Sequence, residues 1–110
     1  MGVTKTEFYT ATQIDLALIF KAFGHPARIA IVDHLLKVNR CICNDLVNEL
    51  QLAQPTISQH LKELKNAGII QGNIEGASIC YCLDEAVFGK VSHFFVQAIA
   101  TLEEKKNTCC

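Results

Sequence analysis

The sequence lacks several features that would place it in other classes of protein. It contains no tryptophan, one methionine and two prolines. No apolar run approaches the roughly 20 residues that a membrane-spanning helix needs, so no membrane contact is expected. No secretion signal is recognisable at the N-terminus, and the cytoplasm is the expected compartment. Half of the 110 residues are hydrophobic and 19% are charged, which argues against disorder and predicts one small domain over residues 1–110.

An excess of positive charge is also missing. Ten Lys and Arg residues stand against eleven Asp and Glu residues, for a net charge of −1. A basic chain would have indicated nucleic acid directly. If this chain binds DNA, its phosphate contacts must come from a few side chains and from backbone amides at helix starts. The side chains available for this are Lys5, Arg28, Lys62 and Lys65.

Cysteine, by contrast, is abundant. The six cysteines form three close pairs, Cys41/Cys43, Cys80/Cys82 and Cys109/Cys110. Without a secretion signal, reduced thiols that bind a metal or sense redox state are favoured over structural disulfides. Some could instead be small buried side chains, since free cysteine often packs as a hydrophobe.

Residues 54–68 carry the most informative pattern, which predicts a short amphipathic helix. Pro55 suits the first helical turn and Gly68 suits the stop. The apolar residues recur at i, i+4 and i+7 and should form one buried stripe. They are Ile57, Leu61 and Leu64.

Polar side chains occupy the rest of this predicted helix. Short donors and acceptors near a helix N-terminus are what contacts with base edges in a major groove require. An ordinary surface helix is the alternative. The predicted DNA-binding residues are Gln54, Thr56, Ser58, Gln59, His60, Lys62 and Lys65.

The segments around this helix strengthen the DNA-binding interpretation. A short helix is predicted over residues 45–51, and a turn or a helix start is predicted over 39–44. The link between 45–51 and the next helix is tight, so residues 45–68 are predicted to form a helix-turn-helix. Two β-leaning runs around a Gly-containing turn predict a hairpin, the wing, over 69–83. In its second strand, Cys80 and Cys82 share the more exposed face.

Helices are predicted at both ends of the chain, over 10–24 and 85–106, with another over 26–38. Within 26–38, Ile29, Val32, Leu35 and Leu36 repeat at helical spacing. The apolar stripe of 85–106 is too wide and aromatic for one small core and predicts a subunit interface. The fold class is therefore mostly α with a small β-hairpin, a winged helix-turn-helix with terminal dimerisation helices.

Over about residues 16–84 the chain resembles the ArsR/SmtB family of metal-responsive bacterial repressors. The similarity rests on the Pro26-Ala27-Arg28 entry to the second helix, on the 45–68 segment and on Gly68 through Asp84. The resemblance implies a homodimer on double-stranded operator DNA that leaves when a ligand binds. It implies no enzymatic activity and no required cofactor.

The sequence departs from the arsenic-sensing members that it resembles. Those carry Cys-x-Cys-Asp-Leu-Cys before the DNA-binding helix. Here Cys41 and Cys43 stand one residue earlier relative to Asp-Leu, and Val47 replaces the third cysteine. The zinc-type site of the family is missing, because His93 stands alone on the last helix.

Cysteine thiolates are therefore the predicted ligands of the inducer. Soft ions choose thiolate ligands, and trivalent arsenic takes three sulfurs in a pyramid. Cys41 and Cys43 can supply two, and Cys109 or Cys110 of the same or the partner chain could supply a third. The predicted inducer is arsenite or a soft divalent metal ion. For the Cys80/Cys82 pair, small strand side chains are preferred over a metal site.

Three alternatives to this function stay open. A thiol redox or persulfide-sensing repressor would need a cysteine in the second helix, and 29–36 has none. A thiol enzyme would need a Cys-x-x-Cys or a Cys–His–acid set, neither of which is evident. A metal carrier that does not bind DNA would be distinguished by its failure to bind a fragment of its own promoter.

Overall fold

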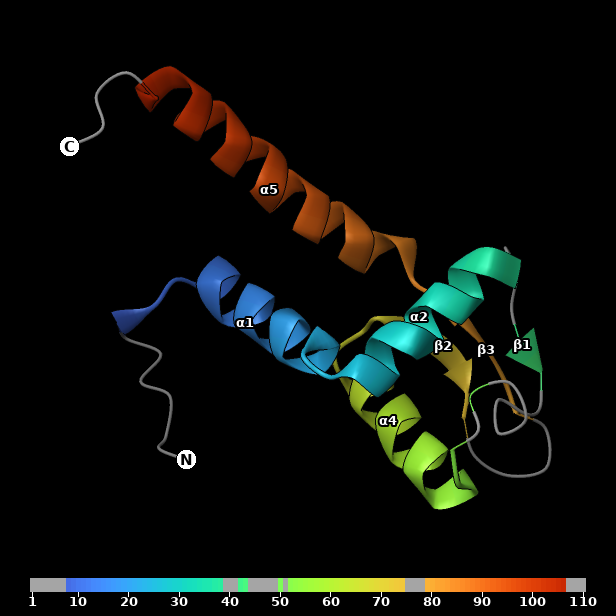
Figure 1. Ribbon diagram of the computed structural model, residues 1–110. Helices are drawn as coiled ribbons and strands as arrows, with labels where there is room; N and C mark the ends of the chain where they lie inside the picture. The colour runs from blue at the N-terminus through green and yellow to red at the C-terminus, as the bar shows by residue number, and fades with distance from the viewer. Residues whose placement is uncertain (1–7, 39–41, 44–49, 51, 75–78, 107–110) are drawn as a thin grey trace.

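The computed structural model describes residues 8–38, 42–43, 50, 52–74 and 79–106 (Figure 1). The described elements are α1 (Ala11–Phe23), α2 (Pro26–Val38), β1 (Ile42–Cys43), α4 (Gln54–Asn66), β2 (Ile70–Asn73), β3 (Cys80–Leu83) and α5 (Glu85–Lys105). The predicted fold class, mostly α with a small β-hairpin, is confirmed by this order. The predicted short helix over 45–51 lies almost wholly outside the described residues.

The ends of the helices follow from local chemistry. Thr10 caps α1 reciprocally with Gln13: its hydroxyl accepts from the Gln13 N–H at 3.0 Å, and its own N–H donates to Gln13 Oε1 at 2.9 Å. At the end of α4, Gly68 has a φ of +79°, and the Ile69 N–H donates to the Leu64 carbonyl at 3.0 Å. This glycine-terminated geometry ends α4 where the sequence predicted a stop.

The sheet has three strands in the order β1-β3-β2, with both pairings antiparallel. Tyr81 of β3 lies opposite Gly72 of β2 on one side and opposite Ile42 of β1 on the other. The prediction of a turn or helix start over 39–44 was therefore wrong for β1. A two-residue strand shows no periodicity in the sequence. It forms by pairing with the edge of β3 that β2 does not occupy.

The core lies between α2, α4 and the sheet, with one side of α1 packed on it. The predicted stripe of Ile57, Leu61 and Leu64 is confirmed, since all three are buried. The predicted helix over 26–38 is present as α2. Of its four regularly spaced apolar residues, Ile29 and Leu36 are about half exposed. The buried residues of α2 are Ile31, Val32 and Leu35.

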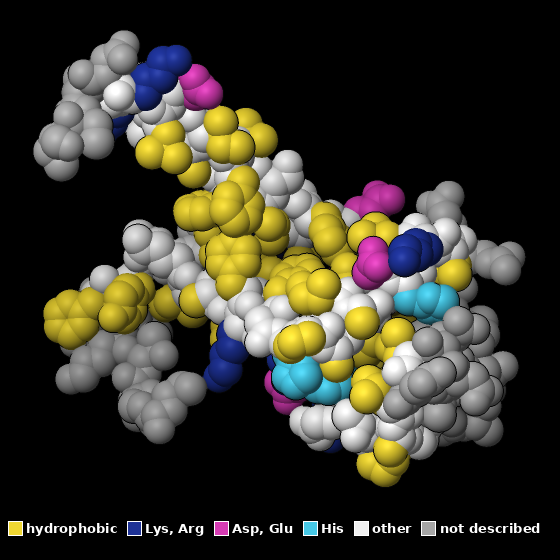
Figure 2. Space-filling view, in the orientation of Figure 1, with side chains coloured by type: hydrophobic (Ala, Val, Ile, Leu, Met, Phe, Trp, Pro, Cys, Tyr) yellow, Lys and Arg dark blue, Asp and Glu magenta, His cyan; other side chains and the backbone are white. Residues whose placement is uncertain are grey.

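Helix α5 extends well beyond this core. Of its residues only Val87 is buried. Figure 1 shows α5 running away from the sheet with α1 alongside it, and Figure 2 shows hydrophobic side chains gathered between the two helices. Among the described helices, none is long and apolar enough to cross a membrane.

Candidate functional site

The outer face of α4 borders a hollow on the molecular surface. Six of the predicted DNA-binding residues are exposed on this helix: Gln54, Thr56, Ser58, Gln59, Lys62 and Lys65. The hollow lies between α4 and the ends of β2 and β3 and has a volume of about 550 Å³. Its lining consists of Gln54, Pro55, Ser58, Gln59, Lys62, Ile74 and Ile79. The fold therefore groups four of the predicted residues beside the hairpin.

The polar side chains on this face are held one turn apart along the helix. Gln54 Nε2 donates to Ser58 Oγ at 3.3 Å, and Gln59 Nε2 donates to Glu63 Oε1 at 3.2 Å. Both hydrogen bonds are exposed, so water or another polar partner can replace either of them at little cost. The amide and hydroxyl groups are thus positioned and available for new hydrogen bonds.

Lys65 links α4 to the hairpin. Its Nζ donates to the Gly72 carbonyl at 2.6 Å. Gly72 has a φ of +119°, and a Cβ there would overlap the carbonyl oxygen of Cys80 on the facing strand. Lys62 and Lys65 are both exposed on α4. Lys62 remains the more available cation for a phosphate, because Lys65 is engaged by the Gly72 carbonyl.

His60 does not face outward as predicted. It is 8% exposed, and its Nδ1 accepts from Arg28 Nε at 3.2 Å. The His25 ring lies 4.5 Å from it, centroid to centroid. Arg28 also donates to the Ala22 carbonyl at 3.3 Å, so this predicted phosphate contact is an internal bridge from α2 to α4.

Burial lowers the pKa of His60, and the nearby His25 and Arg28 lower it further, against a smaller opposing effect of Glu63. The neutral imidazole is therefore favoured, which agrees with its role as the acceptor of the Arg28 N–H. The hydrogen bond between Arg28 and His60 thus links α2 to α4.

The cysteines are only partly within the described residues. Cys41, Cys109 and Cys110 lie outside them. The backbone of Cys43 lies opposite Cys80 in the β1–β3 pair, and Cys80 and Cys82 are both disulfide-bonded. Among the described side chains, no group of three or more His, Cys, Asp or Glu residues could hold a metal ion.

The approach of Cys43 to Cys80 was not predicted from the sequence. The available indication was the shared Cys-x-Cys spacing of residues 41–43 and 80–82, which suits two extended strands whose alternate residues share a face. Recognising the second segment as a strand was possible, but the first was interpreted as a turn.

The face formed by α1 and α5 is apolar and incompletely covered. Phe20 lies 6.2 Å from Phe94 and 5.8 Å from Phe95, and a Lys90–Asp15 ion pair of 2.9 Å flanks this cluster. Further residues of the two helices are more than half exposed. They are Leu18, Val96, Ile99 and Leu102.

Comparisons with known proteins agree with this arrangement. The family model described as "Bacterial regulatory protein, arsR family" matches residues 25–71. The SmtB repressor of Mycobacterium tuberculosis is 38% identical over 82 residues, which are 74% of this chain and 58% of that protein. The arsenical resistance operon repressor of Staphylococcus aureus is 30% identical over 77 residues, 70% of this chain and 73% of that repressor.

Among solved structures, an ArsR family transcriptional regulator has a TM-score of 0.72 at 21% identity. The match covers 83% of this chain and 93% of that one. At this level of identity the likeness concerns the fold alone. The chain spans 58% of the length of the SmtB repressor that it matches.

Proposed function

Because the chain belongs to the arsR family of bacterial regulatory proteins, we propose that it is a DNA-binding transcriptional repressor. A homodimer binds double-stranded operator DNA, and arsenite or another thiophilic metal ion bound to cysteine thiolates releases it. No catalytic step and no resident cofactor are needed. The observation that carries the proposal is the exposed polar face of α4 beside the hairpin, inside the matched residues 25–71.

In this proposal α4 enters the major groove. A helix of 13 residues is about 20 Å long and fits a groove about 12 Å wide. Ser58 and Gln59 are the foremost candidates for base contacts, with Gln54 and Thr56 beside them. Lys62 is the candidate for a phosphate contact, and Lys65 could join it only by leaving the Gly72 carbonyl.

A second copy of the chain is the proposed partner of the α1–α5 face. The radius of gyration is 16.9 Å, whereas a compact chain of this length has about 13 Å. Helix α5 is elongated, and Val87 is its only buried residue. A two-fold pairing through α1 and α5 would cover these residues and set two α4 helices about one DNA turn apart.

Cysteine thiolates are the proposed inducer ligands. Cys41 and Cys43 precede the helix-turn-helix and are the first candidates, and Cys109 or Cys110 could add a third sulfur from either protomer. A relative named for arsenical resistance supports arsenite as the ion to test first. A repressor works where the chromosome is, so the cytoplasm is the proposed compartment.

A thiol redox repressor of the same fold is the second candidate. The disulfide-bonded state of Cys80 and Cys82 favours it. In such a switch hydrogen peroxide would accept two electrons and two protons from two thiols, leaving a disulfide and two water molecules. Its operator complex would respond to peroxide, whereas that of an ion sensor responds to arsenite under reducing conditions.

The test is fluorescence anisotropy of a labelled DNA fragment that carries the gene's own promoter, with a scrambled fragment as control. We expect selective binding that weakens with salt and is lost on adding sodium arsenite to the reduced protein. Release by peroxide but not by arsenite would establish the second candidate instead. Equal binding to both fragments, or no binding, would contradict the repressor proposal.

A further inference from the structure

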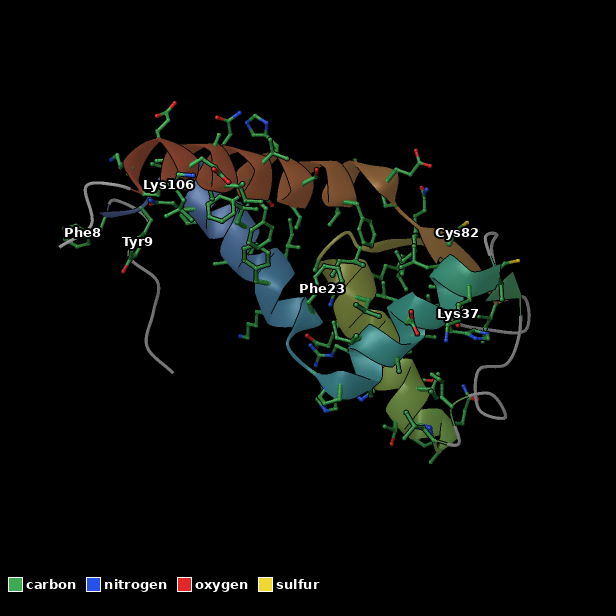
Figure 3. The ribbon with its side chains drawn as sticks, turned by 45° about the horizontal axis from the view of Figure 1, so that its top comes forward. Phe8, Tyr9, Phe23, Lys37, Cys82 and Lys106 are labelled. Carbon is green, nitrogen blue, oxygen red and sulfur yellow. The ribbon has the colours of Figure 1, made fainter. Side chains whose placement is uncertain are left out.

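Three side chains connect the candidate DNA-binding helix α4 to the helices beside it. Arg28 of α2 donates from Nε to His60 Nδ1 of α4 at 3.2 Å, and from Nη1 to the Ala22 carbonyl of α1 at 3.3 Å. The His25 ring lies against the His60 ring, 4.5 Å from centroid to centroid. Figure 3 shows Phe23, the last residue of α1, where α1, α2 and α4 come together. We call His25, Arg28 and His60 the α2–α4 joint.

Both histidines of the joint accept a hydrogen bond at Nδ1. His25 stands directly before α2, and its Nδ1 accepts from the Ala27 N–H at 3.0 Å, an amide that has no partner within the first turn of the helix. His60 Nδ1 accepts from Arg28. A neutral imidazole accepts at one nitrogen only, so each ring carries its proton on Nε2. The joint therefore requires both histidines in the neutral form.

A proton on Nδ1 turns each of these acceptors into a donor. The Nδ1–H of His60 would then face the Arg28 N–H, and the Nδ1–H of His25 would face the Ala27 N–H, so both hydrogen bonds would be lost. A protonated His60 would also hold a positive charge against the Arg28 guanidinium, whose Nε lies 3.2 Å away. Protonation therefore breaks the connection between α2 and α4 and the side-chain cap of α2 together.

The charges around the joint favour the neutral form of His60. Burial is the largest cause that lowers the pKa of His60, the neighbouring His25 and Arg28 lower it further, and Glu63 opposes them. A hollow of about 210 Å³ lies beside Arg28, between α1, α2 and α4. The charged residues that line it are Asp15 and Lys21 of α1, Arg28 of α2 and Glu63 of α4. The joint is thus intact near neutral pH, and His60 takes up a proton only as the solution becomes acidic.

We propose that the α2–α4 joint positions the DNA-binding helix only while both histidines are neutral, so that mild acid weakens operator binding. The inference deepens the proposed function and rests on it for the effect on DNA. Ser58 and Gln59, the foremost candidates for base contacts, directly precede His60 on α4. When the bond from Arg28 is lost, α4 can tilt against α2, and these side chains no longer match the groove. The joint uses neither a metal ion nor a cysteine, so it acts independently of the proposed inducer site.

The direction of the expected pH effect separates the joint from a simple effect of charge. Added positive charge on a protein strengthens its binding to DNA, because the phosphates attract cations. Weaker binding in acid is the opposite result and requires a change in the protein. An imidazole with an ordinary pKa of about 6.5 is about ten parts protonated to one part neutral at about pH 5.5. Each histidine of the joint can therefore weaken operator binding by up to about tenfold at that pH.

The experiment measures binding of the full-length protein to the labelled promoter fragment by anisotropy at about pH 7.5 and about pH 5.5, at the same salt concentration. The test variants are His25→Asn, His60→Asn and the double variant, because the asparagine Oδ1 accepts a hydrogen bond near the place of Nδ1 and does not titrate. His34→Asn is the matched control, since His34 is a half-buried histidine of α2 outside the joint. NMR of isotope-labelled histidines without DNA reports which ring nitrogen carries the proton, and circular dichroism verifies folding.

We expect the operator affinity of the wild type and of His34→Asn to fall by about three- to tenfold at the lower pH. The double variant should lose less than about twofold, and the two single variants should lie between. Near neutral pH, NMR should show the proton of both joint histidines on Nε2. Wild-type affinity that stays constant or rises in acid, an equal loss in the double variant, or a proton on Nδ1 of neutral His60 would overturn the inference while leaving the repressor proposal intact.

The two proposals can fail separately. If the wild type does not bind its promoter at either pH, the repressor proposal fails, and NMR still decides whether the joint exists. The backbone amide signals of α4 should then shift as the wild type is acidified and stay in place in His60→Asn, and signals that shift equally in both would contradict the joint. If the variants at the buried His60 do not fold, His25→Asn, which changes an exposed residue, decides in their place.

Discussion

Replacing Phe95 by aspartate tests whether α1 and α5 form the contact between two copies. Phe95 is 48% exposed in the single chain and lies 5.8 Å from Phe20. A phenylalanine side chain that buries about 200 Å² has about 100 Å² left to bury, which is worth about 2.5 kcal/mol. A two-fold interface contains the residue twice, so Phe95→Asp should cost about 5 kcal/mol of dimerisation free energy, or about a thousandfold or more in dissociation constant.

The assay is sedimentation velocity over nanomolar to high micromolar concentrations. Ile29→Asp is the matched control, because Ile29 is 49% exposed but lies on α2. We expect a wild-type and a control dimer at micromolar concentration and a Phe95→Asp monomer with weakened operator binding. A wild type that is monomeric at micromolar concentration, or a Phe95→Asp protein that stays dimeric, would refute the assignment of this face.

Four further predictions concern single residues. Ser58→Ala should lower specific operator affinity by about 1–3 kcal/mol, whereas Lys62→Ala should weaken binding to all sequences and reduce the salt slope by about 1, both in anisotropy titrations. Because the folded-state pKa of His60 is lowered, the unfolded chain binds the extra proton more readily. Chemical denaturation should therefore show stability that is fully present above about pH 6.5 and declines as the pH falls below it, and His60→Gln should flatten this decline. Gly72→Ala should lower the unfolding free energy by about 1–3 kcal/mol, since its φ of +119° and the facing strand exclude a side chain. Gly89→Ala is the control, because a Cβ at Gly89 would have open space around it. This variant should be neutral or stabilising when both alanine variants are compared by thermal melting.

The α4 helix was predictable because its pattern is local. Pro55 falls in the first turn, the apolar residues recur at helical spacing, and Gly68 adopts the positive φ that a helix stop favours. Each of these depends only on neighbouring residues, so the sequence is sufficient to locate them.

The orientation of His60 was missed because residue polarity was given more weight than spacing. His60 is three residues after Ile57 and one before Leu61, so the helical period places it on the buried side. What permits a histidine there is the Arg28 side chain of α2, which comes from a distant part of the sequence. Tertiary contacts of this kind leave no local pattern.

Strand β1 was unpredictable for a related reason. Two residues show neither an alternating nor a helical period, and their pairing depends on where α2 delivers the chain beside β3. For the same reason, the sequence showed the shared Cys-x-Cys spacing but not that the backbones of Cys43 and Cys80 lie opposite each other. The exposed apolar face of α5 was anticipated from its wide stripe, and its role as a subunit contact stays a prediction.

The central claim is that a thiophilic ion and operator DNA compete energetically for one protein, and reciprocity tests it directly. Isothermal titration with sodium arsenite should be performed on the phosphine-reduced wild type, alone and saturated with its promoter fragment. If the account is right, DNA weakens arsenite binding by the same factor by which arsenite weakens DNA binding, about 5–150-fold for ordinary allosteric coupling. Equal arsenite affinity with and without DNA would contradict it.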